Sequence, residues 1–186
     1  MSADLNKLAE SERLDYYLLG NIEEASSCPK NLNKDEWIAI NIAFFYNEIS
    51  VLYASIAKHC NENNEQCANS KNKTNVYTKK HIRNKLNQIS NLFSDHAFFP
   101  VDRSVPLRED ICDILSQISQ GILKIFEHIY IAHHHEFSSL PMLNAFFLHF
   151  TEFNFQNNVL GDVDLGLLRP LYHKLLECRG NILLVE

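Results

Sequence analysis

The chain has 186 residues, of which 46% are apolar and 22% charged, and its formal net charge is −6 with the histidines neutral. This length and composition predict one globular domain with a hydrophobic core. The acidic balance disfavours nucleic acid as a partner, because it would repel phosphate backbones, and favours a basic peptide or protein instead.

The N-terminal residues are largely polar and lack the apolar segment of a signal peptide. No apolar run approaches the roughly 20 residues of a membrane span, so none is expected. These features predict a reducing compartment, the cytoplasm or the nucleus. There the five cysteines would serve as thiols or metal ligands.

Residues 1–30 are expected to form an N-terminal arm with a short helix, and residues 31–186 a helical domain. The first long helix is predicted to end near residue 56 and to begin where Asn33 and Glu36 have the spacing of a capping box. Apolar side chains cover almost every face of this helix, which is typical of a central helix surrounded by others. Residues 61–75, rich in Asn and charges, predict an irregular loop.

Helical spacing resumes over residues 76–93, and a proline-bounded connection follows at 98–106. Residues 107–134 give the clearest pattern, an apolar stripe in steps of three and four that predicts one long helix. The stripe consists of Ile111, Leu115, Ile118, Ile122, Ile125 and Ile129. Two more helices are predicted at 142–155 and 167–180. No segment alternates convincingly, so the predicted class is all-α, a single-domain bundle of packed helices.

Four histidines gather at the end of the long helix: His128, His133, His134 and His135. One interpretation is a His-rich helix end, where the dipole favours protonated rings. The alternative is a metal site, but side chains five residues apart diverge by roughly 140° on a straight α-helix. A shared metal therefore requires the helix to end or kink between Tyr130 and His133.

The cysteines offer two further ligands for a tetrahedral site. Cys60 and Cys67 are the candidates, although six intervening residues are more than such pairs usually have. Cys112 and Cys178 are expected to be small buried hydrophobic residues. Cys28 precedes a proline in a turn and indicates no function.

Several segments, taken in order, match a known family. Residues 20–37 are similar to a Gly-Asn-Leu…Pro…Asn-Glu-Trp segment, and residues 36–60 to Glu-Trp…Phe-Phe-Asn…Cys. Residues 98–106 are similar to Phe-Pro…Val-Pro, and residues 128–133 to His-Ile-Tyr-His-Gln-His. Residues 143–150 are similar to Leu-Asn-Thr-Ser-Phe-Lys-His-Phe. Together these segments resemble the Mob family of kinase-binding adaptors, which includes phocein.

The resemblance implies a mostly helical Mob-type fold with one structural Zn2+. The positions that match its ligands are Cys60, Cys67, His128 and His133. Three of them match directly, whereas Cys67 stands two residues further along the chain than in most members. The two histidines that follow His133 are then expected to face solvent.

The resemblance also implies a non-catalytic adaptor that binds the N-terminal regulatory segment of an NDR/LATS-type protein kinase. The positions that match the kinase-binding surface are Glu36, Trp37, Ile40 and His149. Core packing is the alternative interpretation for Trp37 and Ile40. Leu32 and Phe44 stand where many members carry acidic residues, so the charge of this surface differs.

Many members bind phosphothreonine peptides, from an upstream kinase or scaffold, through a Lys-Arg-x-x-Arg run. Here Gln120 and Gly121 replace two cations, which leaves Lys124 as a residual phosphate-binding residue. Because a phosphate requires several donors, phosphopeptide binding is expected to be weak, lost or moved elsewhere. A second basic cluster at residues 79–85 is expected to be a solvated helix face.

Two alternatives stay open. One is a metal-free helical interaction module in which Cys67 is not a ligand. The other is a metal-dependent enzyme that uses the histidines with Glu127 and Glu136. The enzyme is disfavoured, because a closed Cys2His2 shell leaves no position for water or substrate and no catalytic motif is present.

Overall fold

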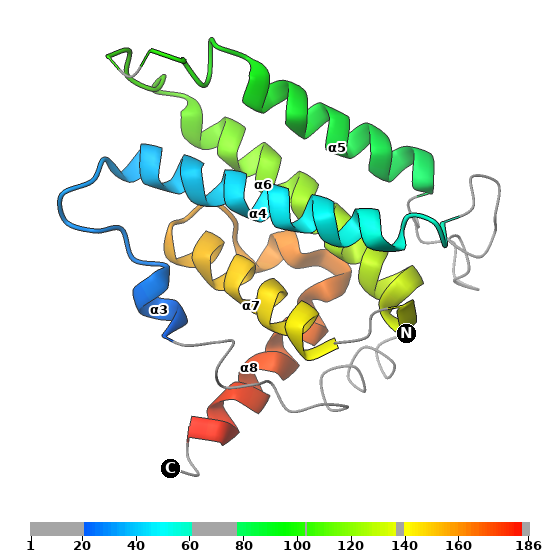
Figure 1. Ribbon diagram of the computed structural model, residues 1–186. Coiled ribbons are helices and arrows are strands. Elements are labelled where there is room, and N and C mark those ends of the chain that lie inside the picture. Colours follow the sequence, from blue (N-terminus) through cyan, green and yellow to red (C-terminus); the bar gives the residue numbers. More distant parts are fainter. Residues whose placement is uncertain (1–20, 61–77, 103, 137–139, 184–186) are drawn as a thin grey trace. The chain divides into compact units, whose positions relative to one another are not determined.

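The computed structural model describes residues 21–60, 78–102, 104–136 and 140–183, and every regular element in these ranges is a helix (Figure 1). The predicted all-α class agrees with this. The loop expected at residues 61–75 lies outside the described residues, and so does Cys67. The chain groups into two compact units, residues 28–133 and residues 1–27 with 134–186. The division predicted at residue 30 stays a prediction.

The unit formed by residues 28–133 is built around one helix. It contains α4 (Lys34–Ile56), α5 (Lys79–Ser94) and α6 (Ile111–His128). Helix α6 contacts both α4 and α5 (Figure 1). It continues directly into η1 (Ile129–His133), a π-helical turn. The predicted stripe of six residues is confirmed as core, because each of them is at most 1% exposed.

Helix α4 begins at a well-defined cap. The Asn33 side chain accepts hydrogen bonds from the backbone N–H groups of Asp35 and Glu36, at 3.0 and 3.2 Å. Within the described residues the Glu36 carboxylate makes no bond back to Asn33, so only half of the predicted capping box forms. The carboxylate is left facing solvent.

The prediction that α4 is surrounded on all sides is wrong. One face is fully buried through Ile42, Phe45 and Ile49. On the opposite face Ile40 is 69% exposed and Val51 68% exposed, with Phe44 also exposed. Residues 40, 44 and 51 fall within about 40° of one another around the helix, so they form one apolar stripe. This exposed stripe is the origin of the all-round apolar pattern.

Helix α4 also has the length and mean hydropathy, 1.2, of a possible membrane span. This differs from the expectation that no run approaches such a length. A core helix of a water-soluble protein passes the same test, and α4 carries Asn33, Asp35 and Glu36 at its start and packs one face against α6. Length and composition alone therefore give weak support for a membrane span.

The second unit packs around α7. Its elements are α3 (Ile22–Ala25), η2 (His134–Glu136), α7 (Leu140–Gln156), η3 (Asp162–Leu168) and α8 (Arg169–Leu183). Helix α7 contacts both α3 and α8. The Asn157 side chain donates to the carbonyl of Ser26 at 3.0 Å and thereby holds the end of α3. The helices predicted at 142–155 and 167–180 are confirmed within a few residues.

Two isoleucines test this assignment of buried and exposed faces. Ile122→Ala should lower the free energy of unfolding by about 2–5 kcal/mol, because the side chain is 0% exposed and its loss leaves a cavity. Ile40→Ala removes the same atoms from an exposed site and should change the free energy of unfolding by no more than about 0.5 kcal/mol. Urea unfolding followed by circular dichroism measures both; equal losses would contradict the assignment.

Candidate functional site

Three side chains from separate segments meet at one buried point. Cys60 lies four residues beyond the end of α4, His128 is the last residue of α6, and His133 is the last residue of η1. The Cys60 Sγ lies 3.3 Å from Nε2 of His128 and 2.9 Å from Nε2 of His133. The three candidate ligand atoms all lie within 4.8 Å of one another.

The π-helical turn explains how two histidines five residues apart reach one sulfur. An α-helix would separate them by roughly 140° around its axis. In a π-helix the backbone bonds run from residue i to i+5, so residues five apart are neighbours on successive turns. The regular helix ends at His128, slightly earlier than the break predicted between Tyr130 and His133. The required change in the helix is therefore present.

The donor set fits a thiophilic divalent metal such as zinc. A tetrahedral zinc ion holds a sulfur and a nitrogen ligand about 3.5 Å apart, close to the two separations given above. A metal-bound thiolate with two imidazole ligands would account for both contacts. All three residues are at most 4% exposed, so this arrangement favours a structural role over substrate access.

The Tyr53 side chain supports this cluster, and no pattern in the sequence predicted its role. Its hydroxyl lies 3.9 Å from the Cys60 Sγ, and its ring meets the His128 ring edge to face at 5.9 Å between centroids. A hydroxyl directed at a thiolate would stabilise the sulfur's charge. His134 and His135 do not belong to the metal-binding group found among the described residues.

The cysteine predictions hold only in part. Cys112 is exposed, so the prediction that it is a buried hydrophobic residue is wrong. Its Sγ lies 4.0 Å from Oδ1 of Asp35. Partial burial, together with the carboxylates of Asp35 and Asp113, raises the pKa of the Cys112 thiol. Cys178 is half-buried, and Cys67, the expected fourth ligand, lies outside the described residues.

Glu36 and Ile40, two of the expected partner-binding residues, lie at a groove of about 460 Å3. One wall is the start of α4, and the other is the connection between α5 and α6, through Phe99, Pro100, Val105 and Leu107. Glu36 is exposed, and core packing is ruled out for Ile40 by its exposure. Trp37 is half-buried, so neither interpretation is excluded for it.

His149, the fourth expected partner-binding residue, lies on α7 in the other compact unit. Its side chain is half-buried. Burial lowers the pKa of the His149 ring, because desolvation disfavours the charged form. The ring is therefore neutral near pH 7 and adds no positive charge to the surface of α7.

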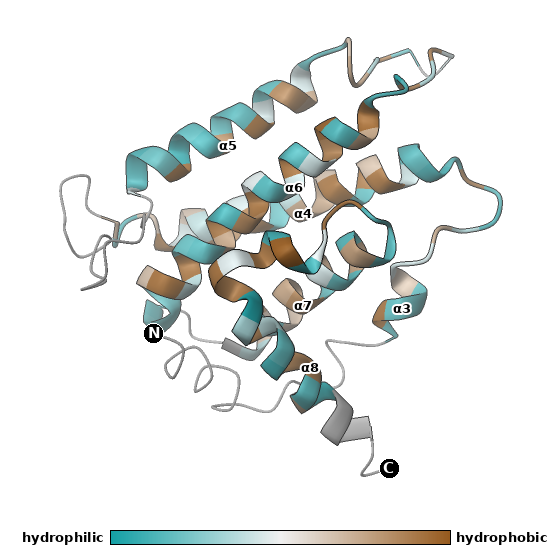
Figure 2. Cartoon of the chain, turned by 180° about the vertical axis from the view of Figure 1, so that it is seen from behind, coloured by the Kyte–Doolittle hydropathy of each residue, from teal (hydrophilic) through white to brown (hydrophobic). Residues whose placement is uncertain are grey.

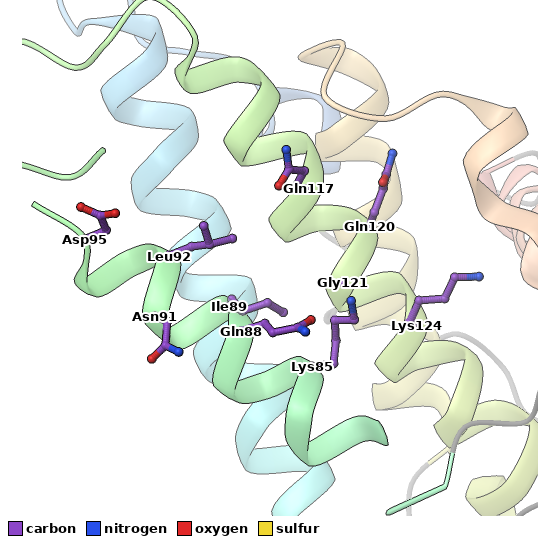
Figure 3. A pocket seen from close by; sticks show the side chains of 10 residues that line it. All are labelled: Lys85, Gln88, Ile89, Asn91, Leu92, Asp95, Gln117, Gln120, Gly121 and Lys124. Carbon is purple, nitrogen blue, oxygen red and sulfur yellow. The ribbon is translucent and has the colours of Figure 1, made fainter. Parts of the chain in front are cut away.

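Lys124 lies in a second and larger groove, of about 680 Å3, between α5 and α6 (Figure 3). Its Nζ is 2.8 Å from Oε2 of Glu127, whose side chain is only 10% exposed. The one cation that remains on α6 is therefore already paired with a carboxylate. Gln120 and Gly121 line the same groove.

Gly121 marks a close approach of α5 to α6. A Cβ at this position would lie 2.9 Å from Cδ1 of Ile89 and 3.2 Å from Cδ of Lys85. The aliphatic part of the Lys85 side chain therefore lies over the backbone of α6 at Gly121, the position where the family pattern has an arginine. This contact was not predicted, because the basic cluster at residues 79–85 was expected to be a solvated helix face.

Comparison with known proteins agrees with these features. The Mob1/phocein family matches residues 17–168. MOB kinase activator-like 2A of Arabidopsis thaliana is 27% identical, with 72% of this chain and 69% of the relative covered. Maintenance of ploidy protein mob1 of Schizosaccharomyces pombe is 28% identical, with 72% of each chain covered.

A third relative matches over a longer stretch. MOB kinase activator-like 1A of Arabidopsis thaliana is 23% identical, with 84% of this chain and 81% of the relative covered. Two of these three relatives are named MOB kinase activator-like, in agreement with the prediction of a non-catalytic kinase adaptor. With most of its length matched, the chain belongs to the Mob1/phocein family.

Proposed function

We propose that this chain is a non-catalytic co-activator adaptor that binds the N-terminal regulatory segment of an NDR/LATS-type protein kinase. Family membership and the relatives named as kinase activators support the kinase as partner. The observation that carries the proposal is the exposed Ile40 beside the Glu36 carboxylate, which has no partner within the described residues.

The chemistry of α4 fits a basic amphipathic helix. The exposed stripe of Ile40, Phe44 and Val51 offers an apolar surface for the apolar face of such a helix. Glu36 offers a carboxylate to an Arg or Lys beside that face, as the net charge of −6 favours. Because Leu32 and Phe44 are apolar, exposed and replace acidic residues of other members, the partner segment is expected to carry apolar side chains opposite them.

One structural Zn2+ belongs to the proposal, held by Cys60, His128 and His133, with Cys67 as the fourth ligand. Bound there, the ion would tie the end of α6 and its π-helical turn to the segment after α4. Its role would be to stabilise the fold. A cytoplasmic or nuclear location suits this role, because a reducing environment keeps Cys60 available as a thiolate.

Phosphothreonine binding is proposed to be weak in this member. Two of the three expected cations are absent from α6, and the third, Lys124, is paired with Glu127. The space above Gly121 is occupied by Ile89 and the stem of Lys85. A phosphate with about −1.5 to −2 charges would lack the forked donors that it requires.

Two substitutions on α4 test the kinase surface. Ile40→Asp and Glu36→Lys should each weaken binding of the kinase segment by about tenfold or more, through lost apolar contact and reversed charge. Isothermal titration calorimetry with an NDR/LATS-type regulatory segment measures the dissociation constants. Failure of the unmodified chain to bind any kinase of this class would remove the proposal.

The matched controls are Val163→Asp and Glu177→Lys. Val163 is 84% exposed and Glu177 is exposed on α8, and neither lies on α4 or lines its groove. Both should bind within about twofold of the unmodified chain. An equal loss in a control and its test variant would assign the effect to general charge or folding.

Metal content tests the zinc site. Elemental analysis of the full chain should find one Zn2+, and Cys60→Ser should release it and lower the free energy of unfolding by several kcal/mol. Cys112→Ser, at an exposed thiol outside the cluster, should retain the metal. Absence of zinc from the unmodified chain would favour the metal-free module, and full zinc affinity in Cys67→Ser would require another fourth ligand.

The crowding at Gly121 gives a stability prediction. Gly121→Arg should lower the free energy of unfolding by about 1–3 kcal/mol, because its Cβ would displace Ile89, which is 2% exposed. Gln120→Arg adds the same charge at the neighbouring exposed position and should stay within about 0.5 kcal/mol. Urea unfolding measures the free energy of unfolding of both variants. Equal values would show that α5 can move away from Gly121 at little cost.

A further inference from the structure

The groove between α5 and α6 has a polar lining and is separate from the proposed kinase-binding surface on α4. Amide side chains come from both helices, Gln88 and Asn91 on α5 and Gln117 on α6. None of these three amides has a hydrogen-bond partner among the described residues. Each amide offers both donor and acceptor atoms, as the backbone of an extended peptide requires. A smaller hollow of about 240 Å3 extends past Lys85 towards His81.

Charge is distributed unevenly along this groove. Lys85 and Lys124 lie near Gly121 at one end, and Asp95 lies at the other (Figure 3). Lys85 is half-buried and has no ion-pair partner among the described residues. Its stem rests on the backbone at Gly121, which holds the ammonium at the groove. Lys85 thus replaces, from α5, a cation that α6 lacks.

The whole of α5 reinforces this positive end. Its first seven residues include Lys79, Lys80, Arg83 and Lys85, and the helix contains no acidic residue. Figure 2 shows α5 as a largely hydrophilic helix. Cations in the first turn oppose the helix dipole, and like charges four residues apart repel. In a chain of net charge −6, such a helix is suited to an anionic partner.

We propose that the α5–α6 groove binds an extended, unphosphorylated acidic peptide segment whose carboxylates lie at Lys85 and Lys124. Residues 85 to 95 span about 15 Å along α5, which corresponds to roughly four or five residues of extended chain. The amides bind the peptide backbone between the two ends. A carboxylate suits this site because Lys124 is shared with Glu127 and no arginine lines the groove.

Binding of short labelled peptides to the full chain tests the proposal. The probe is a fluorescein-labelled Ala-Ser-Ala-Glu-Glu, compared with Ala-Ser-Ala-Gln-Gln at low ionic strength by fluorescence anisotropy. The Glu peptide should bind at least about fivefold more tightly than the Gln peptide. Nuclear magnetic resonance should show shifts of the side-chain amides of Gln88 and Gln117 on its addition. Absence of the preference or of those shifts would overturn the proposal.

Two charge-reversal variants locate the effect. Lys85→Glu should abolish the preference for the Glu peptide, and Lys85→Gln, which keeps a stem over Gly121, should reduce it. Lys80→Glu changes the charge of the same helix equally, at an exposed position that does not line the groove, and should retain the preference within about twofold. An equal loss in Lys80→Glu would indicate general electrostatic attraction and overturn the site.

A phosphopeptide arm distinguishes the two anions. Ala-Ser-Ala-phosphothreonine-Ala carries a charge similar to that of the two glutamates and should bind within about threefold of the Glu peptide. Binding more than about tenfold tighter that is lost in Lys85→Glu would make the groove a phosphate site and overturn the preference for carboxylates. Neither result depends on the α4 surface, so this proposal and the kinase proposal can fail separately.

Discussion

Burial of α6 is the constraint on which the unit formed by residues 28–133 depends. Its apolar stripe packs within the core, and α4 and α5 both lie against it. At Gly121 the side chains of Ile89 and Lys85 on α5 lie close to its backbone, and at His128 it ends in a candidate metal ligand. One helix therefore sets the core, the groove and the candidate metal centre, and a shift of its axis would disturb all three.

Hydrophobic periodicity predicted the core of α6 but not the surroundings of α4. In α6 the apolar residues recur in steps of three and four, so they lie on one face of the helix, and that face must be the buried one. In α4 the apolar residues lie on almost every face of the helix. Their pattern therefore cannot distinguish a helix surrounded by others from one with an exposed docking face. Ile40 and Ile42 are the same residue type two positions apart, yet one is 69% exposed and the other 0%. Tertiary contacts decide between them.

The candidate metal site, like the fold, was predictable only in part. Spacing alone required a break in the helix before two histidines could share a ligand, and the family resemblance selected His133. The type of break, a π-helical turn, was not predicted, because it depends on which backbone carbonyls find partners after folding. The position of Lys85 over Gly121 was also not predicted, because the hydrophobic pattern of a single helix does not determine its distance from a neighbouring helix.

The π-helical turn has a consequence for the path of the chain. Two histidines four residues apart on an ordinary α-helix already face the same side, so ligation by itself does not require a five-residue spacing. The turn holds one residue more than a shared metal would need. Removing Ala132 would leave the two histidines at the spacing of an ordinary α-helix, but the π-helical turn would lose its extra residue. A deletion here would therefore change the backbone of η1 without separating the candidate ligands, so the length of the turn is constrained independently of them.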